Sequence, residues 1–343
     1  MVWPAKCETM RSLKKEFMKL NKYVMILCVL LAYKNSSLFC MLPPNTCPAP
    51  ITSGYVRVNC CEIFFELSGV DVNGTIVFMH GFLQSHKAWV CQRNFFCAQG
   101  YRVLAIDLRG QGVSGGVPPY THDQWASDLD SLLAVLGIPT PVIVAGHSLG
   151  GTVAYHYAIL FPEKVSKLVI FDAAAWYPSN PNSEQAFFTA CTIARETNSL
   201  APFSAILPLI GFDDCTINDP VVAAKAVQLG NIAIEGTNPQ IQCDVYFQGI
   251  VGHDDRAGLQ FITADTFIMY GCNDQIFSPA NMQFTAANIA SSTIIGIVGK
   301  NHDPHYSAAD FCNNLMLQFI QGVPLVSDTS CAGPSAPCSS CLI

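Results

Sequence analysis

A serine set among glycines is the feature that most constrains this chain. Residues 141–158 read PVIVAGHSLGGTVAYHYA, so an apolar run precedes Ser148 and a run of small residues follows it. The first run predicts a buried strand and the second a helix. A serine at such a tight turn has strained backbone angles, and the residues two positions away lie too close for side chains. Gly146 and Gly150 occupy those positions, so the turn exposes the Ser148 hydroxyl beside a helix start that favours negative charge.

Strand and helix patterns alternate on both sides of this turn. Such alternation predicts an α/β fold with a mostly parallel, doubly wound sheet and helices on both faces. Strand patterns occupy residues 55–61 and 63–69 (a hairpin), 75–81, 101–110, 141–148, 167–175, 266–271 and 293–299, and helix patterns occupy 86–100, 121–137, 149–163 and 307–322.

The alternation stops near residue 176, and residues 176–262 hold apolar helical stretches without a convincing strand. We interpret this segment as a helical lid inserted late in the sheet. The expected organisation is a leader (1–40), a first core part (41–175), the lid (176–262), a second core part (263–322) and a Ser/Pro/Cys-rich tail (323–343).

An exposed serine becomes a nucleophile only with a base and a group that orients the base. The chain order serine, acid, histidine predicts an acid after a late strand and a histidine after the last strand. Asp274 follows the strand pattern at 266–271, and His302 follows the final one. His305 remains an alternative base, and Asp172, after the preceding strand, remains an alternative acid.

An oxyanion hole needs two backbone N–H groups. Leu149, directly after the serine, supplies one, and Phe82 in the HGF stretch supplies the other. Gly81 lets the chain turn closely there, and His80 braces the loop rather than acting as a base. We expect Asp107, at the end of a strand beside the site, to organise the following loop through hydrogen bonds.

The first 40 residues have the layout of a secretory leader. A basic stretch precedes the 11-residue apolar run YVMILCVLLAY, which is short for a membrane span but suits a signal peptide. No clear cleavage site follows, so a retained signal anchor is the alternative. Sixteen cysteines, 14 of them beyond the apolar run, favour an oxidising compartment and disulfides. We therefore expect a secreted protein, or a signal-anchored one facing the lumen or cell exterior.

Charge and cysteine spacing exclude several classes of partner. Beyond residue 34 the chain has 11 basic and 23 acidic residues, a formal net charge of −12, and no basic run. Nucleic acid and anionic membrane surfaces are therefore not expected partners, and the leader is the only expected membrane contact. Cys338 and Cys341 have a zinc-like spacing without a second pair or a nearby histidine, so we expect no metal and no cofactor.

The motifs, in order, resemble those of the α/β-hydrolase superfamily over about residues 55–322. They are HGF, DLRGQGVSGG, GHSLGG, GCNDQIFSP and KNHDPH. Within the superfamily the chain is similar to single-domain esterases and to the cofactor-free haloperoxidase-like group. One departure is the lysine and asparagine before His302, where family members often have glycine.

The resemblance implies a Ser148–His302–Asp274 triad and an acyl-serine intermediate. Serine at the turn implies esters, lactones, thioesters or amides, whereas epoxide hydrolases of this superfamily have aspartate there. The apolar lid suggests small, largely apolar esters or lactones as substrates. Acyl transfer or perhydrolysis on the same triad, and a non-catalytic ligand-binding relative, are the alternatives.

Overall fold

The computed structural model describes residues 47, 50–178, 181–204, 231, 235–332, 334 and 336. The expected leader and the Cys338–Cys341 pair lie outside these residues. Among the helices of the described part, none has the length and apolar character needed to cross a membrane.

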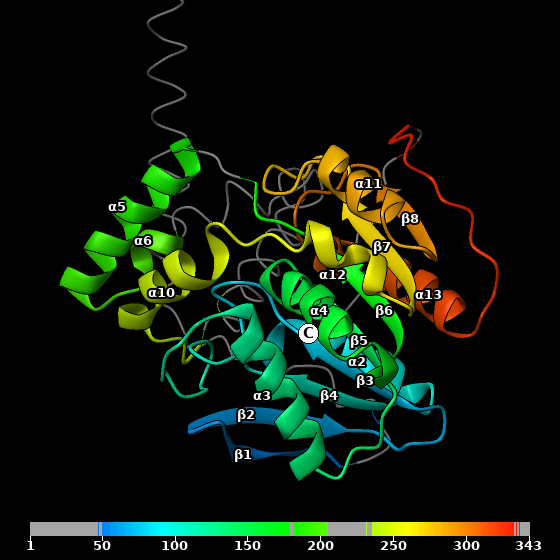
Figure 1. The fold of residues 1–343 in the computed structure, drawn as a ribbon, viewed down its shortest axis with the longest axis horizontal. Helices are drawn as coiled ribbons and strands as arrows, with labels where there is room; N and C mark the ends of the chain where they lie inside the picture. The colour runs from blue at the N-terminus through cyan, green and yellow to red at the C-terminus, as the bar shows by residue number, and fades with distance from the viewer. Residues whose placement is uncertain are drawn as a thin grey trace, which may run out of the picture. The chain divides into compact units, whose positions relative to one another are not determined.

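An eight-stranded sheet forms the centre of the fold, with the strand order β1-β2-β4-β3-β5-β6-β7-β8 (Figure 1). The hairpin strands β1 and β2 pair antiparallel, β2 pairs antiparallel with β4, and the remaining pairs are parallel. This confirms the predicted α/β architecture. The strands are β1 (Thr52–Val58), β2 (Cys61–Ser68), β3 (Thr75–Met79), β4 (Arg102–Ile106), β5 (Val142–His147), β6 (Val165–Phe171), β7 (Asp265–Gly271) and β8 (Ser292–Ile297).

Helices cover both faces of the sheet. Successive residues of a strand point to opposite faces, so each strand contributes to two separate cores. On β3, Val77 and Met79 pack into the core with α3, α4 and α11, whereas Ile76 and Phe78 pack into the core with α2 and α13. The core helices are η1 (His86–Trp89), α2 (Val90–Ala98), α3 (His122–Val135), α4 (Leu149–Leu160), η2 (Pro162–Lys164), α11 (Pro279–Ala287), α12 (Pro304–Ser307) and α13 (Ala309–Ile320).

The lid enters the chain between β6 and β7, as predicted. Its described elements are α5 (Pro181–Thr197), α6 (Ala201–Ser204), α10 (Pro239–Val245), η3 (Tyr246–Ile250) and η4 (Arg256–Phe261). Figure 1 shows α5, α6 and α10 grouped together beside the sheet. Phe187 of α5 stacks on Tyr246 with ring centroids 4.5 Å apart, so aromatic packing joins the separate lid segments.

Part of the tail after residue 322 is attached to the core. Cys331 forms a disulfide with Cys272, which directly follows β7. Asp328 forms a bridge with Ile295 of β8, and its carbonyl oxygen accepts a 2.7 Å hydrogen bond from the Gly296 N–H. The low-complexity composition alone gave no sign of this attachment.

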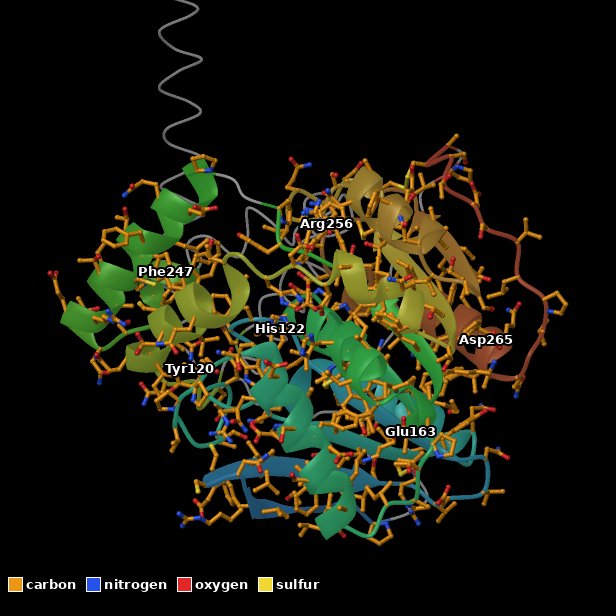
Figure 2. The ribbon with its side chains drawn as sticks, viewed as in Figure 1. Tyr120, His122, Glu163, Phe247, Arg256 and Asp265 are labelled. Carbon is orange, nitrogen blue, oxygen red and sulfur yellow. A yellow bond between two sulfur atoms is a disulfide. The ribbon has the colours of Figure 1, made fainter. Side chains whose placement is uncertain are left out.

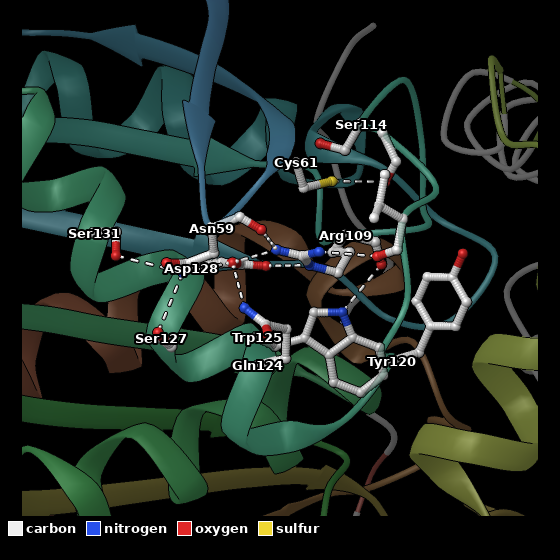
Figure 3. A network of polar contacts seen from close by, with 12 residues as sticks. Asn59, Cys61, Arg109, Ser114, Tyr120, Gln124, Trp125, Ser127, Asp128 and Ser131 are labelled. Carbon is white, nitrogen blue, oxygen red and sulfur yellow. Dashed lines mark hydrogen bonds and ion pairs between the residues drawn. The ribbon is translucent and has the colours of Figure 1, made fainter.

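A buried ion pair ties the loop after β4 to α3 (Figure 3). Arg109 donates from Nε to Asp128 Oδ2 and from Nη2 to Asp128 Oδ1, each at 2.7 Å, and the Arg109 side chain is 1% exposed. Arg109 also donates to the carbonyl oxygens of Val117 and Asn59, and the Trp125 indole donates to the Arg109 carbonyl. The pair therefore fixes the loop, the β1–β2 turn and α3 relative to one another.

Replacing Arg109 by alanine is expected to lower the free energy of unfolding by about 3–5 kcal/mol, because Asp128 is left charged and buried without its partner. Urea unfolding followed by circular dichroism measures the change. Arg195→Ala is the matched control: Arg195 pairs with Asp244 on the lid surface, both are about half exposed, and the expected loss is below about 1 kcal/mol. Equal losses in the two variants would contradict this interpretation of the network.

Candidate active site

Ser148 lies at the turn between β5 and α4 in a strained conformation, with φ 50° and ψ −117°. A Cβ atom on Gly146 would lie 2.2 Å from the Gly150 carbonyl oxygen, and one on Gly150 would lie 2.1 Å from the Met79 carbonyl oxygen. Both glycines are therefore required by close backbone approach, as expected from the sequence. The strain holds Ser148 where a regular strand or helix residue would not lie.

His302 and Asp274 meet across the carboxyl ends of β7 and β8. His302 Nδ1 lies 2.9 Å from Asp274 Oδ2. Asp274 Oδ1 accepts hydrogen bonds from the Ile276 and Phe277 N–H groups at 2.7 and 3.2 Å. These bonds fix the carboxylate, which in turn fixes the histidine ring. His302 and Ser148 line the same cavity.

The charge state of His302 follows from its neighbours. Burial lowers the pKa of His302, but the negative charges of Asp274 and Asp303 and the hydrogen bond that His302 donates to Asp274 raise it more. The net result is a pKa above the ordinary value of 6.5. His302 therefore combines basicity with a fixed orientation, as a general base requires.

His305, the alternative base, lies in a different environment. Its side chain is fully buried against the rings of Trp89, Tyr306 and His147, with centroids 4.8, 4.4 and 4.2 Å away. Neither ring nitrogen has a hydrogen-bond partner among the described residues. Burial and the nearby His302 lower the pKa of His305 to about 3. In this position the His305 side chain serves to pack the core.

Asp172, the alternative acid, lies close to Asp274 rather than apart from it. It follows β6 in a left-handed conformation, with φ 46°, and is fully buried. Its Oδ1 accepts a 2.8 Å hydrogen bond from the Gly271 N–H. One oxygen of Asp172, one oxygen of Asp274 and one nitrogen of His302 lie within 4.8 Å of one another.

The expected oxyanion donors border the cavity. Phe82 and Leu149 both line it, and Leu149 begins α4, where backbone N–H groups lack intrahelical partners. A Cβ atom on Gly81 would lie 2.8 Å from His147 Nδ1, so the loop requires glycine there. His80 Nε2 accepts from the Leu108 N–H at 3.1 Å, so this ring braces the loop.

Asp107 links the start of η1 to the loop that follows β4. Its carboxylate accepts hydrogen bonds from the His86 and Val113 N–H groups at 2.5 and 2.9 Å and lies 2.8 Å from His86 Nδ1. Burial raises the pKa of Asp107, but the bonds from His86 outweigh it, and the net pKa is lowered. Asp107 is therefore an ionised structural anchor.

A large part of the cavity lining is aromatic. Phe82, Tyr246 and Phe187 contact one another at centroid distances of 4.5–6.0 Å, and Phe203 lies 6.4 Å from Phe82. Tyr177 and Phe277 extend this wall. Lid and core thus both contribute to it.

A polar wall was not predicted from the sequence. His122 and His253 also line the cavity and stack with ring centroids 3.3 Å apart. Figure 2 shows His122 at the junction between the lid and the core helices. The Thr152 hydroxyl donates to the Leu149 carbonyl, so it accepts from His122 Nε2 at 2.8 Å. No spacing in the sequence links positions 122, 152 and 253, so this group could not be predicted.

Two groups of side chains have the spacing of metal ligands among the described residues. They are His147 with Asp303 and His305, and Asp172 with Asp274 and His302. A metal ion at the second group would replace the bond between His302 and Asp274. In the group of His147, Asp303 and His305, His147 Nε2 donates a 2.8 Å hydrogen bond to the His302 carbonyl oxygen. This nitrogen carries a proton and therefore offers no lone pair to a metal ion.

Comparison with known proteins gives one consistent result. Residues 74–309 match the family model described as alpha/beta hydrolase fold. The chain is 26% identical over 275 residues to a proline iminopeptidase of Pestalotiopsis fici, covering 75% of this chain and 95% of that protein. It is 30% identical over 273 residues to a non-heme haloperoxidase of Rhodococcus erythropolis, covering 76% and 96%. A thermophilic esterase of Thermogutta terrifontis superposes with a TM-score of 0.69 at 23% identity, covering 79% and 99%.

Proposed function

Because the chain belongs to the α/β-hydrolase fold family, we propose that it is a serine hydrolase that cleaves carboxylic esters. Ser148 is the nucleophile, His302 the general base and Asp274 the residue that orients His302. The observation that carries this proposal is the position of Ser148. It lies at a strained turn and lines the same cavity as His302. The Nδ1 of His302 is held by the Asp274 carboxylate.

The proposed reaction uses the proton positions that these contacts impose. Asp274 accepts the Nδ1–H of His302, so the Nε2 lone pair is free to take the Ser148 proton. Ser148 Oγ then bonds to the ester carbonyl carbon, and the N–H groups of Phe82 and Leu149 hold the oxyanion. The carbon–oxygen bond to the alcohol breaks, and Nε2 returns the proton to the leaving oxygen. Water, activated in the same way, releases the acid and restores Ser148.

The aromatic wall supports small, largely apolar esters or lactones as substrates. Burial of apolar groups against Phe82, Phe187 and Tyr246 favours an acyl or alcohol part of matching shape. Phe187 is 7% exposed and part of this wall, whereas its neighbour Phe188 is 55% exposed on the lid surface. The two phenylalanines therefore form a matched pair for testing the wall.

A series of p-nitrophenyl esters with increasing acyl length tests this proposal. The wild-type protein is expected to prefer short or medium chains, and Phe187→Ala to shift the preference to longer chains by about tenfold in relative kcat/KM. Phe188→Ala is expected to leave the preference unchanged. Equal shifts in both variants would remove Phe187 from the acyl site, and a folded wild-type protein without activity on any ester would overturn ester hydrolysis.

Acyl transfer to hydrogen peroxide is a second candidate, supported by the likeness to the non-heme haloperoxidase. It uses the same acyl-serine intermediate and differs only in the acceptor. Adding hydrogen peroxide and acetate to the assay, with bromide oxidation as the readout, separates the two. Peracid formation that exceeds hydrolysis would favour the second candidate.

We propose that the protein is exported, as the basic and apolar pattern of the first 40 residues suggests. The disulfides Cys47–Cys97 and Cys272–Cys331 support this proposal, because such bonds persist in oxidising compartments. Thiol counting before and after reduction of natively expressed protein tests it. Fully reduced cysteines would contradict export.

A further inference from the structure

The buried carboxyl group of Asp172 has no role in the reaction proposed above. It is fully buried, and only one of its oxygens has a hydrogen-bond partner among the described residues, the Gly271 N–H. Asp274, a few ångströms away, accepts bonds from two backbone N–H groups and from His302. The two carboxyl groups are therefore unequally solvated by the protein.

Two adjacent buried carboxyl groups do not both remain ionised, and the better solvated one keeps the charge. Here that group is Asp274. Asp303 adds a like charge that acts on Asp172 in the same direction. The Cys312 thiol of α13 adds no charge, because burial raises its pKa. The Lys300 charge lowers the pKa of Cys312, but by less than burial raises it. Burial and the Asp274 charge together raise the pKa of Asp172 well above its usual range.

We propose that Asp172 holds a proton at neutral pH and that its Oδ2–H group points to the Asp274 carboxylate, making Asp172 a positioning residue of the triad. The other carboxyl oxygen of Asp172, Oδ1, accepts a hydrogen bond from the Gly271 N–H. Gly271 begins the turn whose fourth residue is Asp274. Asp172 thus holds both the carboxylate and the turn that carries it. This inference rests on the proposed triad.

The most direct test is the imidazole titration of His302, followed by NMR in wild-type protein and in Asp172→Asn. The His302 signal is assigned from its loss in His302→Gln. An asparagine keeps the shape, the oxygen that binds Gly271 and an N–H donor, but it never carries charge. If Asp172 is protonated, the His302 pKa changes by less than about half a unit. If Asp172 is ionised, its removal lowers the His302 pKa by about one to three units, which overturns the proposal.

Asp303→Asn is the matched control for this titration. Asp303 is adjacent to His302, and its carboxylate raises the pKa of His302, so its loss is expected to lower that pKa measurably. The control shows that the measurement detects a lost neighbouring charge. Because the titration does not depend on turnover, an inactive wild-type protein would reject the proposed function while the NMR result still decides the state of Asp172.

Kinetics of the same variants test the positioning role. Asp172→Ala removes the hydrogen bond from the Gly271 N–H and the proposed one to Asp274. It is expected to lower kcat about 10- to 100-fold with little change in KM, whereas Asp172→Asn restores kcat to within about threefold of wild type. Unchanged kcat in Asp172→Ala, or no recovery in Asp172→Asn with an unaltered melting temperature, would each overturn it.

Discussion

Replacing Ser148 by alanine is expected to lower kcat/KM for ester hydrolysis at least about 10³-fold, with the fold intact. The hydroxyl oxygen is the atom that bonds to the carbonyl carbon, so its loss removes the covalent route and leaves only the surrounding electrostatic stabilisation. Steady-state hydrolysis of a short p-nitrophenyl ester measures the effect.

The thermal unfolding midpoint of Ser148→Ala serves as its control. Alanine at position 148 keeps the left-handed backbone conformation and deletes one oxygen, so the midpoint is expected to change by only a few degrees. A stable variant that retains more than about a tenth of wild-type activity would place the nucleophile elsewhere.

Replacing His302 by alanine is expected to cause a loss of similar size, because Ser148 is then left without a base. In the wild-type protein, kcat/KM rises with pH as His302 loses its proton. Since the pKa of His302 lies above 6.5, the midpoint of this rise is expected above pH 6.5. The pH dependence of kcat/KM between pH 5 and 9 measures it.

His305→Phe is the matched variant for the second histidine. The His305 ring packs against the rings of Trp89 and Tyr306 and is expected to remain neutral throughout this pH range, so a phenylalanine fits its surroundings. Most of the activity and the same pH midpoint are expected. Loss of activity in His305→Phe together with retention in His302→Ala would transfer the role of base to His305.

The sequence was most informative where one chemical reason fixes a local structure. Continuous apolar runs, several of them ending in glycine, identified the parallel strands, since strands buried on both faces need apolar side chains on both. Gly146 and Gly150 identified the turn at Ser148, because a Cβ atom at either position would lie only 2.1–2.2 Å from a backbone carbonyl oxygen. The chain order of serine, acid and histidine pointed to Asp274 and His302 at the ends of the last two strands, and their side chains lie 2.9 Å apart.

Contacts between segments that are distant in the chain could not be predicted from the sequence. His122 and His253 stack because the segment that follows η3 returns to the start of α3. The carboxyl groups of Asp172 and Asp274 lie within a few ångströms because β6 and β7 are neighbours, yet the sequence presents these residues as competing acids. The Cys272–Cys331 disulfide joins a segment whose composition suggested no contact at all. Each of these depends on tertiary packing rather than on a local pattern.

Covalent labelling by a fluorophosphonate tests the central claim most directly, because the reagent reacts with an activated serine and needs no knowledge of the substrate. The wild-type protein is incubated with the probe, digested and analysed by tandem mass spectrometry. We expect one adduct, on Ser148, with labelling that is lost in Ser148→Ala and greatly slowed in His302→Ala. An adduct on another serine, or folded wild-type protein that remains unlabelled, would contradict the assignment of Ser148 as an activated nucleophile.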